Sequence, residues 1–317
     1  MQPAQKLLQR LNTNIGRAIV GKSDSIELIL NAILCGGHVL IEDVPGVGKT
    51  TLASAFAKSL ALSFKRIQFT PDVTPSDVTG YTSIDFSTNT MQFREGAVFA
   101  QLVLADEINR TSPKTQSSLL EVMQEGQVTI DGQTHLLPEP FIVLATQNPV
   151  DFVGTYPLPE AQLDRFFMRV SIGYPSKEEE IRVLDMYSTN DRLVDDLEPV
   201  CSAGDIIELK QLVTEVRVSK EMRYYITSIA QASRTSKLFT RGISTRGAIA
   251  LMRASQACAL LNGRDYVMPE DVKKMACPVL AHRIVLSPEA RMSTRGITDE
   301  KVITRLISGL QVPVRVK

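Results

Sequence analysis

Short apolar runs alternate with amphipathic stretches in the first half of the chain. The runs at residues 38–41, 102–105 and 141–145 are nearly continuous, which is typical of strands that are covered on both faces of a parallel sheet. Residues 50–60 and 112–124 lie between these runs, and their pattern predicts helices. Alternating strands and helices indicate an α/β layered domain.

Two hairpins are predicted to interrupt this alternation. The first spans residues 84–93 and turns at residues 87–90. The second joins residues 127–130 to residues 133–137 through Asp131-Gly132, a strong two-residue turn signal between alternating segments. We expect both hairpins to be insertions on the α/β core.

The second half changes character near Tyr174-Pro175. Ser176 and Glu179 have the spacing of a capping box, so a helix is expected to begin there. The periodic stretches that follow are helical in pattern and cover residues 179–187, 205–213, 220–233, 244–261 and 269–283. We therefore predict an α/β domain over residues 1–175 and an all-helical domain over residues 176–317.

Length and charge narrow the class of protein. The chain has 317 residues, enough for two domains. Lysine and arginine number 35, as do aspartate and glutamate, so the formal net charge is +0. This balance argues against binding nucleic acid or an anionic membrane by bulk charge. The chain lacks a run of 18 apolar residues, so membrane insertion is not expected.

The N-terminal segment and the cysteines favour a cytoplasmic protein. The first twenty residues interrupt their apolar positions with polar ones, which indicates an amphipathic helix and not a signal peptide. The four cysteines and three histidines are scattered and form no CxxC pair, so we expect buried, reduced thiols and no structural zinc site.

The strongest chemical signal is a strand, a glycine-rich loop and a helix at residues 38–60. Residues 43–50 align with the phosphate-loop pattern G-x-x-x-x-G-K-[ST], although Asp43 stands at the first glycine position. Lys49 is expected to contact the β- and γ-phosphates, and the Thr50 hydroxyl to bind Mg²⁺. The predicted nucleotide-binding residues of the loop are Pro45, Gly46, Val47, Gly48, Lys49, Thr50 and Thr51.

Polar residues follow the other two buried runs. Asp106, at the end of the second run, would hold Mg²⁺ through water, and Glu107 would act as the general base toward the attacking water. Solvated loop carboxylates are the alternative. Asn148 follows the third run and could bond both a γ-phosphate oxygen and that water, although Asn-Pro is also an ordinary turn.

With these motifs the chain resembles the AAA+ ATPases, and within them the MoxR family, over nearly its whole length. The segments that carry the resemblance are residues 20–22, 42–50, 68–72, 75–80, 95–96, 105–110, 113–116, 121–126, 145–149, 157–166, 174–175 and 279–290. It implies a P-loop NTPase core with a parallel sheet and β-hairpin insertions, followed by an all-helical lid. The hairpins correspond to the family's helix-2 insert and to the hairpin before sensor 1, and Asp43 is a tolerated variation of the loop.

The resemblance also implies roles for two arginines. Arg165 resembles the arginine finger that a subunit presents to its neighbour's γ-phosphate, with Arg110 and Arg169 as rivals. A salt bridge within the subunit is the alternative for Arg165. Arg246 resembles sensor 2, reaching from the lid to the phosphates, although Ile243 and Thr245 replace the family's usual alanine and proline.

The turn at the end of the first helix has two interpretations. Val20 and Gly21 resemble the backbone pocket for adenine, and a plain helix-to-helix turn is the alternative.

The resemblance implies Mg²⁺-dependent ATP hydrolysis by a chaperone-like motor that remodels or matures protein complexes. The expected assembly is a homo-oligomer, a hexameric ring, with a client that could carry a von Willebrand factor A domain. Nucleic acid is not an expected partner. Three alternatives stay open: the motor subunit of a metal chelatase, a nucleotide-dependent binding switch with little turnover, and a DNA-remodelling motor.

Overall fold

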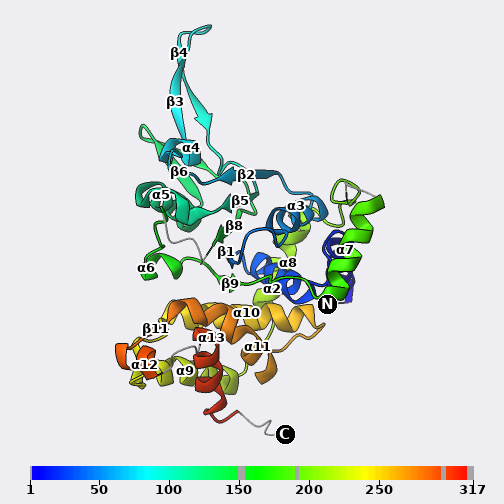
Figure 1. The fold of residues 1–317 in the computed structure, drawn as a ribbon, viewed down its shortest axis with the longest axis vertical. Helices are drawn as coiled ribbons and strands as arrows, with labels where there is room; N and C mark the ends of the chain where they lie inside the picture. The colour runs from blue at the N-terminus through cyan, green and yellow to red at the C-terminus, as the bar shows by residue number, and fades with distance from the viewer. Residues whose placement is uncertain (1, 149–153, 190–192, 294–297, 313–317) are drawn as a thin grey trace.

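A computed structural model describes residues 2–148, 154–189, 193–293 and 298–312. The first half is built on a five-stranded parallel sheet of order β2-β5-β8-β1-β9. Its strands are β1 (Val39–Glu42), β2 (Phe64–Gln68), β5 (Leu102–Asp106), β8 (Ile142–Gln147) and β9 (Met168–Val170). The three apolar runs form β5, β8 and β1 at the centre of the sheet, so the expected α/β core is confirmed (Figure 1).

The two edge strands, β2 and β9, were not predicted from the pattern. An edge strand has one neighbour, and β2 accordingly carries Lys65, Arg66 and Gln68 in a half-exposed setting. Strand β9 is only three residues long. Neither segment gives the continuous apolar run that identifies a strand covered on both faces.

Alternate strand residues enter two separate cores. Val39 and Ile41 of β1 pack on the face that is covered by α1 (Gln2–Ala18), α2 (Ser23–Leu34) and α3 (Lys49–Ser59). Leu40 points to the other face, which is covered by α4 (Pro75–Thr79) and α5 (Pro113–Glu125). The period of two along β1 thus produces the layered arrangement.

Both predicted hairpins are confirmed. One pairs β3 (Gly80–Asp85) with β4 (Thr90–Glu95), and the other pairs β6 (Gln127–Ile130) with β7 (Gln133–Leu136). The β3–β4 hairpin projects from the body of the molecule (Figure 1). Phe93 and His135 stack with ring centroids 3.9 Å apart and so connect the two hairpins.

The second half is mainly helical, as expected. Its helices are α7 (Lys177–Thr189), α8 (Ala203–Glu215), α9 (Lys220–Thr235), α10 (Thr245–Leu261), α11 (Pro269–Leu280), α12 (Pro288–Ser293) and α13 (Asp299–Ser308), and a short α6 (Glu160–Leu163) precedes them. The expectation of an all-helical domain missed a ribbon of β10 (Phe239–Arg241) and β11 (Val285–Leu286). Three and two residues are too few to show strand alternation.

The helical region packs directly against the sheet domain. Asn31 of α2 is fully buried, and its amide donates a 2.9 Å hydrogen bond to the carbonyl of Ala254 in α10. The core beneath α1–α3 continues into α8–α11 without a break. Among the described residues, we find no helix with the length and apolarity that crossing a membrane requires.

Candidate nucleotide-binding site

A loop at the carboxyl end of β1 leads directly into α3. Gly46 and Gly48 take positive φ values of 84° and 86°, a conformation that strains other residues. Gly48 is the N-cap of α3 and provides no side-chain cap, so the first N–H groups of this helix stay available. A helix N-terminus of this kind binds phosphate readily.

Lys49 is the first residue of α3 and lies back over the loop. Its ammonium donates a 2.8 Å hydrogen bond to the carbonyl of Asp43. Burial lowers the pKa of Lys49, and the carboxylates of Asp106, Asp43 and Glu107 oppose this shift. The ammonium is thus placed among the predicted acids and above the loop that would hold phosphates. Thr50 and Thr51 follow it as half-buried residues.

Asp43, the departure from the loop pattern, has a structural role. Its carboxylate accepts hydrogen bonds from the backbone N–H groups of Ile172 and Gly173, both at 2.6 Å, and from Val44 at 3.0 Å. The start of the loop is thereby fastened to the segment that follows β9. A glycine could not make these bonds, which gives a physical reason for aspartate at this position.

The predicted acids lie at the same edge of the sheet, after β5. Asp106 is buried and accepts a 2.6 Å hydrogen bond from the hydroxyl of Thr146. The same hydroxyl accepts one of 2.8 Å from the backbone N–H of Glu107. Glu107 takes a left-handed conformation with φ 56°, which is strained for a residue with a side chain. Thr146 therefore fixes the turn that presents both carboxylates.

Side chains from β2 and from the 3-10 turn Ile108–Arg110, which follows β5, contact the two acids. Arg66 lies 2.7 Å from the Asp106 carboxylate. Gln68 donates a 2.9 Å hydrogen bond to Glu107, and Arg110 forms a 3.1 Å ion pair with it. No sequence motif indicated roles for Arg66 and Thr146. The register Gln68↔Asp106 in the β2–β5 pair explains why β2 reaches the acids.

Asn148 follows β8, the strand between β5 and β1. It is buried, and its carbonyl accepts a 3.3 Å hydrogen bond from Asn109. Because the carboxyl ends of parallel strands meet at one edge, Asn148 lies between the acids and the glycine loop. The three polar strand ends that the sequence singled out are therefore brought together.

Val20 and Gly21 form the turn between α1 and α2. Gly21 has φ 72°, and a side chain there would collide with Glu179. The adjacent Lys22 donates a 3.0 Å hydrogen bond to the carbonyl of Tyr174. This turn and Asp43 of the glycine loop both rest on residues 171–179, so the predicted adenine pocket lies next to the predicted phosphate site.

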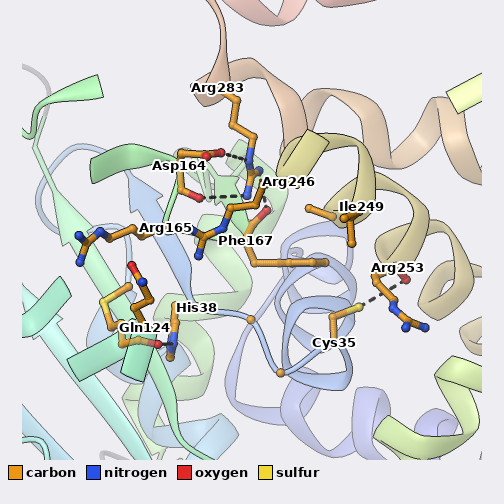
Figure 2. A pocket seen from close by; sticks show the side chains of 14 residues that line it. Cys35, His38, Gln124, Asp164, Arg165, Phe167, Arg246, Ile249, Arg253 and Arg283 are labelled. Atoms are coloured by element: carbon orange, nitrogen blue, oxygen red, sulfur yellow. Dashed lines mark hydrogen bonds and ion pairs between the residues drawn. The ribbon is translucent and has the colours of Figure 1, made fainter. Parts of the chain in front are cut away.

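Arg165 and Arg246 lie together, but they lie near the amino ends of the sheet strands, opposite the carboxyl ends that carry the glycine loop and the acids. Both line a pocket of about 250 Å³ that also includes Gly37 and His38, which precede β1 (Figure 2). The phosphate loop begins at Asp43, after β1. The four residues of β1 lie between His38 and Asp43, so the two are five residue steps apart, which is roughly 16 Å at about 3.3 Å per step. The structure therefore does not bring either arginine to Lys49 of its own subunit.

Comparisons with known proteins agree with this architecture. The model of the ATPase family associated with various cellular activities (AAA) matches residues 38–168, and that of the AAA lid domain matches residues 231–306. Chaperone MoxR1 of Mycobacterium tuberculosis is 38% identical over 315 residues, which are 96% of this chain and 82% of that protein. This chain belongs to the MoxR family of AAA+ ATPases.

Two further proteins show how much of the chain the similarity covers. YeaC of Bacillus subtilis (strain 168) is 50% identical over 309 residues, which are 98% of this chain and 96% of YeaC. A crystal structure from Cytophaga hutchinsonii matches with a TM-score of 0.91 and 38% identity, and the match covers 99% of this chain and 97% of that one. The MoxR-type fold thus extends over both the sheet domain and the helical lid.

Arg110 and Arg169, the other two candidates for the arginine finger, form ion pairs within this MoxR-family chain. Arg110 is paired with Glu107. Arg169 is largely buried and forms ion pairs with Glu42 at 3.2 Å and Glu300 at 2.5 Å. Arg165 forms no ion pair within the described part of the chain, and its side chain points away from the Asp164–Arg283 pair (Figure 2). Of the three arginines, it is therefore the one that the ion pairs of the described residues leave unpaired.

Proposed function

We propose that this chain hydrolyses ATP with Mg²⁺ at sites shared between neighbouring subunits of a closed ring. One observation carries the proposal: Lys49, Glu107 and Asn148 lie at one edge of the sheet, and Arg165 and Arg246 lie at the other. Neither arginine side chain spans the separation of roughly 16 Å along β1. A second subunit must therefore bring its arginines to the phosphates that the first subunit binds.

The residues at the carboxyl edge fit Mg²⁺, which prefers hard oxygen ligands. Asp106 supplies a carboxylate at the end of β5, and Thr50 supplies a hydroxyl in the first turn of α3. The Asp106 carboxylate interacts electrostatically with Lys49, the neighbour of Thr50, and acts to raise the pKa of its ammonium. When bound, the ion would neutralise charge that develops on the transferred phosphoryl group.

The chain's own residues bind the nucleotide, accept the proton and orient the attacking water. The backbone of Gly46 and Gly48 and the ammonium of Lys49 hold the phosphates, and the turn at Val20 and Gly21 holds adenine. Glu107 accepts a proton from the attacking water, and Asn148 orients that water and the γ-phosphate.

Glu107 is not free to act as a base while Gln68 and Arg110 both bond its carboxylate. Nucleotide binding must therefore be accompanied by release of this side chain. The strained φ of Glu107 indicates that the turn is held by its surroundings, which include the Thr146 hydroxyl and Arg110 as well as Gln68 of β2.

A repeated interface between unlike surfaces closes into a ring when the rotation permits, and we propose a ring of six. Residues 1–175 bind nucleotide, and residues 176–317 form the lid. The ring works in the cytoplasm as a chaperone-like motor that remodels or matures protein complexes, including clients with a von Willebrand factor A domain. It acts without nucleic acid and without inserting into a membrane.

The test mixes two inactive variants. Lys49→Ala has no working phosphate site, and Arg165→Ala should lose turnover by a factor on the order of 10³–10⁵. In a mixed ring, an intact loop can face an intact arginine, so activity returns and increases with protein concentration. If mixed rings form and show no turnover, Arg165 does not act on a neighbour and the proposal fails.

A further inference from the structure

The lid carries a buried arginine whose contacts converge on one short segment of the sheet domain. Arg283 is only 4% exposed and lies in a single 3-10 turn, Ala281–Arg283. Its guanidinium contacts Asp164 Oδ1 at 2.7 Å, the carbonyl of Phe166 at 2.7 Å and the carbonyl of Phe167 at 3.1 Å. It also donates to the carbonyl of Val279, next to its own turn.

These contacts surround Arg165 on both sides. Asp164 precedes Arg165 and Phe166 follows it, and both are bonded by the same guanidinium. Arg165 itself lies between the four-residue helix α6 and the strand β9, where its N–H donates to the Gln162 carbonyl at 3.1 Å. Local secondary structure thus contributes little to holding this position, and the lid contributes most of the side-chain bonds.

Arg283 remains a cation in this setting. Burial lowers its pKa to about 10, and the nearby Asp164 carboxylate opposes this shift. A buried charge is costly unless it is paired and hydrogen-bonded. The loop around Arg165 is therefore held in the one arrangement that satisfies the guanidinium.

We propose that Arg283 is a positioning residue for the arginine finger: it fixes the loop that presents Arg165 to the neighbouring subunit. This inference rests on the proposed action of Arg165 across the ring. A second lid residue acts in the same way, since His282 bonds the carbonyl of Phe166 at 3.0 Å. Because of these contacts, the lid and residues 164–167, which we call the finger loop, would move together as a single body in each subunit.

The first test replaces Arg283 with lysine. Arg283→Lys keeps the charge, but a single ammonium cannot reproduce the fork that spans Asp164, Phe166 and Phe167. We expect kcat to fall on the order of 10²-fold, the effect of a misplacement near 1 Å. The affinity for ATP should stay within about twofold, since positioning of this kind acts on turnover and not on the subunit's own nucleotide site.

Arg264→Lys is the matched control. Arg264 is another lid arginine in an ion pair, at 2.5 Å from the buried Asp271. Among the described residues, its side-chain hydrogen bonds go to Asp271 and Tyr266 and not to residues 164–167. Its substitution should leave kcat within about twofold of the wild type. Asp164→Asn is the second variant. It removes the carboxylate charge and keeps the shape, so it tests the same contact if Arg283→Lys does not fold.

Mixed rings separate positioning from general damage. Arg283→Lys subunits have an intact phosphate loop, so mixing them with Lys49→Ala subunits, whose Arg165 is intact, should restore turnover. Mixing them with Arg165→Ala subunits should restore none, because neither partner presents a working finger. Restoration in the second mixture, or in neither while the Lys49→Ala and Arg165→Ala mixture is active, overturns the role of Arg283. If that reference mixture is itself inactive, the shared-site function fails instead.

Discussion

The guanidinium of Arg66 lies 2.7 Å from the carboxylate of Asp106. Asp106 is the proposed Mg²⁺ ligand, so Arg66 and the metal would compete for the same carboxylate. Arg66 is 46% exposed on the edge strand β2, and it also bonds Gln68, which in turn bonds Glu107. Arg66 thus connects the two acids of the site through one strand.

From this contact we predict that Arg66→Gln strengthens Mg²⁺-dependent nucleotide binding. Without the guanidinium, the ion no longer displaces a cation from Asp106. A titration of Mg²⁺ against a fluorescent ATP analogue should show half-saturation at a lower metal concentration than in the wild type. Arg94→Gln, on the exposed β3–β4 hairpin, is the control. An unchanged or higher half-saturation would show that Arg66 does not compete with the metal.

Lys49→Ala should abolish tight ATP binding. Lys49 is the cation of the phosphate loop, and its ammonium already lies over the Asp43 carbonyl. Calorimetric titration with ATP measures the loss directly. Lys58→Ala, in the last turn of the same helix, should bind ATP normally. ATP affinity that survives in Lys49→Ala would remove the phosphate-loop assignment.

Glu107→Gln should bind ATP normally and hydrolyse it roughly 10²–10⁴-fold more slowly, since the amide cannot accept the proton. The amide can still bond Gln68, so the turn at Glu107 should keep its shape. Phosphate release under saturating ATP is the measurement, with ATP affinity as the control. Turnover close to the wild-type rate would mean that another group is the base. The trapped ATP-bound form is also suited to capturing clients.

The centre of the fold could be predicted from the sequence because its signals are local. Strands β1, β5 and β8 coincide with nearly continuous apolar runs. The residues assigned to chemistry come at or just after their ends: the glycine loop after β1, Asp106 and Glu107 at the end of β5, and Asn148 after β8. The hairpins were predicted from alternation and Asp131-Gly132. Edge strand β2 was missed because Lys65, Arg66 and Gln68 interrupt its apolar pattern.

The relationships around the site could not be predicted, because they depend on contacts between distant segments. Arg66 and Asp106 are brought together by the β2–β5 register. Asp164 and Arg283 meet across the boundary between sheet domain and lid. The placement of Arg246 beside Arg165 and not beside Lys49 likewise follows from how α10 packs on α2. No short motif encodes such packing.

Stability should depend on pH through His38. This side chain is buried, with Nδ1 accepting from the Val143 N–H and Nε2 bonding the Met123 carbonyl, and burial lowers its pKa from 6.5 to about 4. Between about pH 4 and pH 6.5, His38 is therefore protonated in the unfolded chain and neutral in the folded chain. Stability contributed by the neutral form is present above pH 6.5 and is lost as pH falls toward 4.

Urea unfolding of the wild type and His38→Gln at pH 7 and pH 5 measures this effect. Each pKa unit corresponds to about 1.4 kcal/mol, so His38 should account for roughly 2 kcal/mol of the wild type's loss at pH 5. The variant should therefore be less pH-dependent by that amount. Because the buried His282 is present in both proteins, its own contribution cancels. Equal pH dependence would mean that His38 takes up its proton in the folded state.

Arg246→Ala should separate nucleotide binding from turnover. Arg246 lines the pocket with Arg165 at the edge of the sheet away from Lys49, so it should contribute nothing to ATP held by its own subunit. At protein concentrations where subunits are dissociated, the variant should bind ATP with wild-type affinity. In assembled rings it should lose turnover, and mixing with Lys49→Ala subunits should restore part of it. A loss of affinity in the dissociated variant would show that the lid closes over its own phosphate loop, and that Arg246 acts within one subunit.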